Sequence, residues 1–124
     1  MIGSLPPSVR LYVCTDATDM RKSFDGLAAL VEHVLEEDPL SGHLFCFFNR
    51  RTDRCKILWY DHHGHGYALF AKRLERGRFR VPVAKPGERS VTMRAAELAL
   101  ILEGIDLRGA KYRRVWRPRE RRAA

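Results

Sequence analysis

Two apolar runs separated by a short polar turn constrain the fold of this chain more than any other feature. Residues 44–49 form a nearly continuous apolar run, as in a strand buried on both faces. Residues 55–60 form a second run rich in β-forming side chains, and the polar residues 50–54 between them suit a turn. The two runs predict a β-hairpin inside a hydrophobic core.

The residues before the hairpin predict a strand and a helix. Residues 9–14 alternate in polarity and are rich in β-formers, which predicts a strand. Thr18 or Asp19 then caps a predicted helix that runs to about Glu37, because apolar side chains recur there at helical spacing. Gly26 weakens this helix, and a close packing contact would explain its presence.

The residues after the hairpin predict two more strands and a second helix. Residues 67–74 favour a strand over a short helix. Residues 78–83 alternate basic and apolar side chains and predict an edge strand, since Pro82 cannot serve a central ladder. Thr92 caps a predicted helix that ends at about Glu103, with Gly104 as its stop.

These elements predict one α+β domain: an antiparallel β-meander of about four to five strands packed with two helices. The length of 124 residues suits a single domain. We assign residues 1–107 to this domain and residues 108–124 to a basic C-terminal tail. The tail carries eight basic residues and one acidic residue, and so holds most of the net charge of +8. Such a block typically acts as an interaction arm.

Basic side chains also flank the predicted turns, where they favour a nucleic-acid partner. If both turns point the same way, one set of cations meets a phosphate backbone. Aromatic residues interleave with them: Trp59 and Tyr60 on the hairpin, Tyr112 and Trp116 in the tail, although Trp59 suits a core position better than base stacking. The candidate nucleic-acid-binding residues are Arg50, Arg51, Arg54, Lys56, Lys72, Arg73, Arg76, Arg78, Arg80, Arg113, Arg114, Trp116 and Arg117.

The sequence offers little support for catalysis or for a cofactor. His62, His63 and His65 suggest a metal site, but no fourth ligand lies at zinc-finger spacing, so we expect a polar turn without metal. Asp53, Asp61 and Glu75 lack the clustered arrangement of a magnesium-dependent nuclease. Neither a nucleophile elbow nor a phosphate loop occurs. We therefore expect no enzyme activity and no cofactor.

The remaining signals indicate a cytoplasmic protein. The odd number of cysteines (Cys14, Cys46 and Cys55) argues against a disulfide framework, and Cys14 and Cys46 fit core positions. The N-terminus lacks the pattern of a signal peptide, and no apolar stretch is long enough to span a membrane.

A series of short motifs resembles a known family. In order they are TDMRKSFDGL at 18–27, DPLSGHLF at 38–45, KILWYD at 56–61, KRLERGRF at 72–79 and LEGID at 102–106. Together they resemble the accessory protein TnpB encoded by the second open reading frame of the sixty-six-type bacterial insertion sequences. The resemblance covers residues 9–107 and is specific only because the motifs occur in the right order. Val81 stands where the family commonly has tryptophan, and neither the histidine turn nor the tail belongs to the pattern.

The resemblance implies a role in transposition beside a separate transposase and another small accessory protein, and it supplies no catalytic residues. Three functions remain open. The first is a non-catalytic accessory protein that associates with DNA at the ends of the element, with the transposase, or with both. The second is a protein–protein adaptor without DNA contact. The third is a small metal-dependent nuclease, against which the scattered carboxylates argue.

Overall fold

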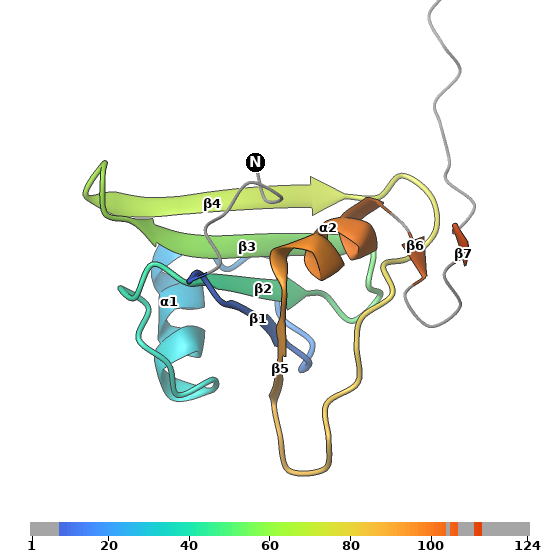
Figure 1. The fold of residues 1–124 in the computed structure, drawn as a ribbon, viewed down its shortest axis with the longest axis horizontal. Coiled ribbons are helices and arrows are strands. Elements are labelled where there is room, and N and C mark those ends of the chain that lie inside the picture. The colour runs from blue at the N-terminus through green and yellow to red at the C-terminus, as the bar shows by residue number, and fades with distance from the viewer. Residues whose placement is uncertain (1–7, 104, 107–110, 113–124) are drawn as a thin grey trace, which may run out of the picture.

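The computed structural model describes residues 8–103, 105–106 and 111–112 (Figure 1). A five-stranded sheet has the order β4-β3-β2-β1-β5, and a separate two-stranded ribbon pairs β6 with β7. The elements are β1 (Leu11–Cys14), α1 (Phe24–His33), β2 (Leu44–Phe48), β3 (Arg54–Asp61), β4 (Gly66–Arg73), β5 (Ser90–Met93), α2 (Ala95–Glu103), β6 (Ile105–Asp106) and β7 (Lys111–Tyr112).

The α+β class is confirmed, but the sheet is a meander only in part. β2, β3 and β4 follow one another as antiparallel neighbours, as predicted. β1 instead pairs in parallel with β2, and α1 forms the crossover between them. Parallel neighbours require such a crossover, because a tight turn can join only antiparallel strands. The C-terminal ends of β1 and β2 therefore lie at the same end of the sheet.

Each face of the sheet is covered by one helix. Leu11 and Val13 of β1 belong to a core cluster with Leu98 and Ile101 of α2. Tyr12 and Cys14 point to the other face, in a cluster that includes residues of α1. Because both faces are covered, β1 and β2 are buried at every position, which explains their continuous apolar character.

The predicted edge strand over 78–83 is wrong. None of these residues is in a strand, and the edge next to β1 is formed by β5, which the sequence analysis missed. The alternation that suggested a strand has a different origin. Phe79 is buried while Arg78 and Arg80 are exposed, so a single anchoring side chain produces the pattern without a ladder of hydrogen bonds.

Helix α1 is shorter than predicted at both ends. It begins at Phe24, five residues beyond Asp19, and Ser23 occupies the N-cap position without a side-chain hydrogen bond. It ends at His33, with Val34 as the C-cap in the right-handed region and its N–H donating to the Leu30 carbonyl. Three residues beyond His33, Glu36 has a positive φ of 56°, and the next N–H, of Glu37, donates to the Val31 carbonyl. This left-handed residue turns the chain away from the helix axis after the helix has ended. Gly26 does make a close approach, since a Cβ there would lie 3.2 Å from the Lys22 side chain.

The predicted cap of the second helix is also wrong. Thr92 lies in β5, where it pairs with Tyr12, and α2 begins at Ala95. A Glu97 side-chain oxygen accepts a long hydrogen bond of 3.4 Å from the Arg94 N–H, as the N3 residue does in a capping box. The helix ends at Glu103 as expected, and Gly104 lies outside the described residues.

All three cysteines are free and buried, which agrees with the core positions predicted for Cys14 and Cys46. Burial raises the pKa of the Cys55 thiol to about 11, and it also raises the pKa values of Cys14 and Cys46. Neither helix in the described part of the chain has the length and apolar character that crossing a bilayer requires.

Candidate nucleic-acid interface

The turn after β2 and the segment after β4 meet at one end of the sheet. The Leu74 N–H donates to the Asp53 carbonyl over 2.7 Å, and the Phe79 N–H donates to the Thr52 carbonyl over 2.6 Å. These bonds fix residues 74–79 against the turn at residues 49–53. The cations that flank the two turns are therefore neighbours, which is the arrangement that the sequence analysis left as a condition.

Phe79 anchors this segment in the core. Its ring is 3% exposed and lies 5.5 Å from the ring of Phe48, the last residue of β2. Both rings belong to the cluster under α2. Because Phe79 is directed inward, the flanking Arg78 and Arg80 are held on the surface.

Side-chain hydrogen bonds order the turn at residues 49–53. The Asn49 side-chain oxygen accepts from the backbone N–H groups of Asp53 and Arg54, and its amide donates to the Asp53 carboxylate over 2.6 Å. This amide contact is the main reason that the pKa of Asp53 is lowered. Thr52 adopts a positive φ of 54°. The turn presents Arg50 and Arg51 to solvent in a defined geometry.

Two arginines lie directly opposite each other at this end. Arg54 of β3 pairs with Arg73 of β4. The Arg54 carbonyl accepts from Asn49 of the turn, so its main-chain groups point toward β2 and the Arg54–Arg73 pair lacks mutual hydrogen bonds. Such pairs have Cα atoms only about 4.5 Å apart, and opposed like charges destabilise a sheet. An open cavity of about 420 Å³ lies over the pair, lined also by Met20 and Lys56.

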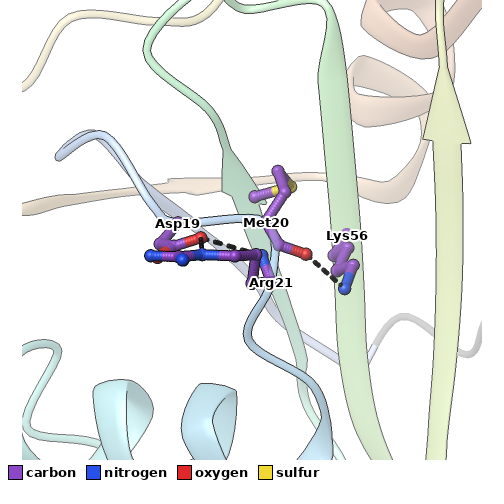
Figure 2. A network of polar contacts seen from close by, with 4 residues as sticks. All are labelled: Asp19, Met20, Arg21 and Lys56. Atoms are coloured by element: carbon purple, nitrogen blue, oxygen red, sulfur yellow. Dashed lines mark hydrogen bonds and ion pairs between the residues drawn. The ribbon is translucent and has the colours of Figure 1, made fainter.

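The loop before α1 also reaches this end of the sheet. The Thr18 N–H donates to the Phe48 carbonyl over 2.8 Å. The Lys56 ammonium, which projects from β3, donates to the carbonyls of Met20 and Lys22 over 2.8 and 2.7 Å (Figure 2). These contacts place Met20 against the cavity, and Arg21 and Lys22 follow it in the chain at the same end of the sheet.

Arg21 is held in place although it is exposed. Its guanidinium forms a forked ion pair with the Asp19 carboxylate, with a shortest distance of 2.7 Å (Figure 2). Hydrogen bonds from the Arg21 side chain and backbone lower the pKa of Asp19 to about 2. Asp19 therefore orders this loop and does not cap a helix, which explains why α1 begins later than predicted.

We call this surface the basic end of the sheet. It joins the turn after β2, the end of β4, the segment that follows it and the loop before α1. Among the described residues, Arg50, Arg54, Arg76, Arg78 and Arg80 are exposed and have no carboxylate partner within 4 Å. Arg73 contacts Glu75 at 3.1 Å, and Arg51 lies 4.0 Å from Asp53. The basic end consists of Arg21, Lys22, Arg50, Arg51, Arg54, Arg73, Arg76, Arg78 and Arg80.

Two of the candidate cations have internal partners. Lys56 holds the loop before α1, as described above. Lys72 points to the other face of the sheet, where its ammonium donates to the Leu102 carbonyl in the last turn of α2 over 2.9 Å. This position suits a cation, because the last carbonyls of a helix lack partners of their own. We therefore assign both lysines structural roles.

Replacing Lys56 with methionine tests this assignment. The variant keeps the length of the side chain but loses two charge-assisted hydrogen bonds. We expect a decrease of about 1–2 kcal/mol in the free energy of unfolding, measured by urea denaturation. Lys56→Arg should recover part of this loss. If methionine left stability unchanged and Arg21 no more mobile by NMR relaxation, Lys56 would not order the loop.

The other candidate residues lie apart from the basic end or outside the residues that the structure describes. Asp53 and Asp61 stand at opposite ends of the β3 region, and Asp61 accepts a hydrogen bond from His63 in the next turn. No cluster of three metal-ligating side chains occurs within the described ranges. Trp59 packs against the core under α2. The tail residues Arg113, Arg114, Trp116 and Arg117 lie outside the described residues, and the assigned boundary after residue 107 falls between β6 and β7.

Sequence reasoning missed Arg21 and Lys22, although a signal for them exists. They follow β1, and residues 49–53 follow β2. Had the pair been recognised as parallel, both segments would have been placed at the same end of the sheet.

Comparisons with known proteins identify the family. The family described as IS66 Orf2-like protein matches residues 9–112. Two relatives come from Sinorhizobium fredii (strain NBRC 101917 / NGR234). The uncharacterized protein y4hO is 42% identical over 90% of this chain and 91% of its own length. The uncharacterized protein y4jC is 36% identical over 89% of this chain and 91% of its own length. No solved structure gives a significant match. The chain therefore belongs to the IS66 Orf2-like family of insertion-sequence proteins.

Proposed function

We propose that this chain is a non-catalytic accessory protein of transposition that binds the phosphate backbone of DNA with the basic end of its sheet. The observation that carries the proposal is the convergence of exposed arginines from separate segments, with Arg54 and Arg73 opposed at its centre. Folding brings these like charges together at a cost, and a bound polyanion offsets that cost.

The chemistry of the surface favours backbone contact over base reading. Guanidinium groups form forked hydrogen bonds with phosphate oxygens. The two hairpin aromatics that suggested stacking lie elsewhere: Trp59 packs on the core, and Tyr60 contacts Tyr67 and His62 near the opposite end of β3. We infer modest sequence preference from the chain alone, with the element's transposase and second accessory protein supplying the choice of site.

Fluorescence anisotropy with a labelled duplex tests the proposal. The purified full chain should bind a duplex from an insertion-sequence end and an unrelated duplex of equal length with similar affinities at low salt. Binding that is absent at high micromolar protein would contradict it and favour the adaptor. The transposase added to the same assay should then capture the chain without DNA contact.

The absence of catalysis is tested separately. We expect supercoiled plasmid to remain intact after incubation with the chain and Mg²⁺ or Mn²⁺, because catalytic metal sites of nucleases use clustered carboxylates. Agarose gels report nicking. Nicking that disappears in a variant with Asp53, Asp61 and Glu75 all changed to alanine would overturn this part of the proposal. Nicking that persists in that variant indicates a contaminating nuclease.

A further inference from the structure

The outer edge of β4 is a long strand edge without the usual protection. β3 and β4 pair over eight consecutive positions without a bulge. Within the described part of the chain no strand pairs with the other side of β4 (Figure 1). Residues 67–71 contain no charge and no proline, the devices that commonly prevent edge pairing. An edge of this kind accepts another strand.

The direction of the main-chain groups defines which residues would pair. The Leu74 N–H points toward β3, since it donates to the Asp53 carbonyl. Main-chain groups alternate along a strand, so those of Tyr67, Leu69 and Ala71 point away from β3 toward the open edge. These three residues offer N–H and carbonyl groups to a new neighbour.

We propose that a second copy of this chain pairs antiparallel with this edge, with Leu69 opposite Leu69 of the other copy. In this register Tyr67 faces Ala71, and Ala68 faces Phe70, so each aromatic ring meets a small side chain. The residues whose main-chain groups point toward the open edge (Tyr67, Leu69 and Ala71) then form hydrogen-bonded pairs across the two copies. A two-fold axis perpendicular to the sheet relates the copies, and α1 of each copy lies on the same face.

Charge favours the same arrangement. The antiparallel register places Arg73 of one copy opposite His65 of the other, two residues from Tyr67. Carboxylates lie near Tyr67: its pKa is raised mainly by burial and further by Asp38 and Asp25. Arg73 of one copy therefore approaches the end of β4 near which Asp25 and Asp38 of the other copy lie. A parallel arrangement would instead bring like charges together.

The dimer would separate its two basic ends. The two Arg73 positions are eight residues apart along the strands, which corresponds to roughly 27 Å. The basic ends then face away from each other at opposite poles. If the proposed function holds, one dimer contacts two separate segments of DNA.

Sedimentation velocity of the full chain without DNA tests the pairing. We expect a species of twice the 14.3 kDa chain mass. Ala71→Pro should give the monomer, because it removes an outward N–H from an exposed position while leaving the ladder to β3 intact. The matched control Ala71→Ser keeps the N–H and should remain a dimer. A monomeric wild-type chain at 100 µM or a dimeric Ala71→Pro chain would overturn the proposal.

Cross-linking tests the register independently of the proline variant. In the proposed pairing the two Leu69 Cα atoms lie about 5.5 Å apart, within the range of a disulfide. Leu69→Cys should therefore form covalent dimers under oxidation, whereas Ala71→Cys, displaced by four residues between copies, should not. Burial of the three native cysteines keeps them from competing. Cross-linking of Ala71→Cys in preference to Leu69→Cys, or of neither, would contradict the register. Neither assay contains DNA, so its outcome is separate from that of the proposed function.

Discussion

Replacing Phe79 with alanine is expected to lower the free energy of unfolding by about 3–5 kcal/mol, the usual range for truncating a buried phenylalanine. Its ring is 3% exposed and packs on Phe48. The substitution removes apolar contacts and leaves a cavity at the basic end. Urea denaturation followed by circular dichroism measures the loss.

Phe24→Ala is the matched control. Phe24 begins α1 and is 43% exposed. Its truncation should lower the free energy of unfolding by about 1 kcal/mol or less, because less buried apolar area is lost and alanine is the better helix former. Equal losses in the two variants would show that Phe79 does not anchor the segment that carries Arg78 and Arg80.

Reversing charge at Arg76 and Arg78 with glutamate is expected to lower affinity for duplex DNA by roughly tenfold to a hundredfold at 0.1 M salt. Two phosphate contacts are lost and two repulsive charges are gained at the same surface. Both side chains are exposed and lack a carboxylate partner within the described residues, so the fold should persist. Fluorescence anisotropy gives the dissociation constants, and circular dichroism checks the fold.

The control for net charge is the double variant Arg10→Glu and Arg94→Glu. Arg10 precedes β1 and Arg94 follows β5, so both lie at the opposite end of the sheet. This variant lowers the net charge of +8 by the same amount. It should lose much less affinity. Equal losses would mean that only total charge matters and that the basic end has no special role.

The sequence predicted the central elements of the fold because their patterns are local. The continuous apolar run of β2 and the hairpin to β3 depend on neighbouring residues alone. The parallel pairing of β1 with β2 depends on a contact across more than thirty residues, as in Leu11 opposite Leu44. No local pattern distinguishes this parallel pairing from a meander. β5 was missed because its residue Thr92 was taken as the cap of the second helix.

The candidate site was predictable to the extent that it depends on charge and turns. The cations around residues 50–54 and 73–80 could be listed from the sequence, and the structure brings them together. The internal roles of Lys56 and Lys72 could not be predicted, because their partners are carbonyls of distant segments, Met20 and Leu102. A lysine in a strand looks the same in sequence whether it binds phosphate or a helix terminus.

A salt titration of DNA binding tests the central claim most directly. Each phosphate contact contributes about −0.9 to the slope of log K against log salt. In the full chain, changing Arg78 and Arg80 to glutamine should reduce the magnitude of the slope by about 1.8. Changing Arg10 and Arg94 to glutamine should leave it near that of the unsubstituted chain. A slope that is flat in the unsubstituted chain, or that falls equally in both variants, would contradict DNA binding by the basic end.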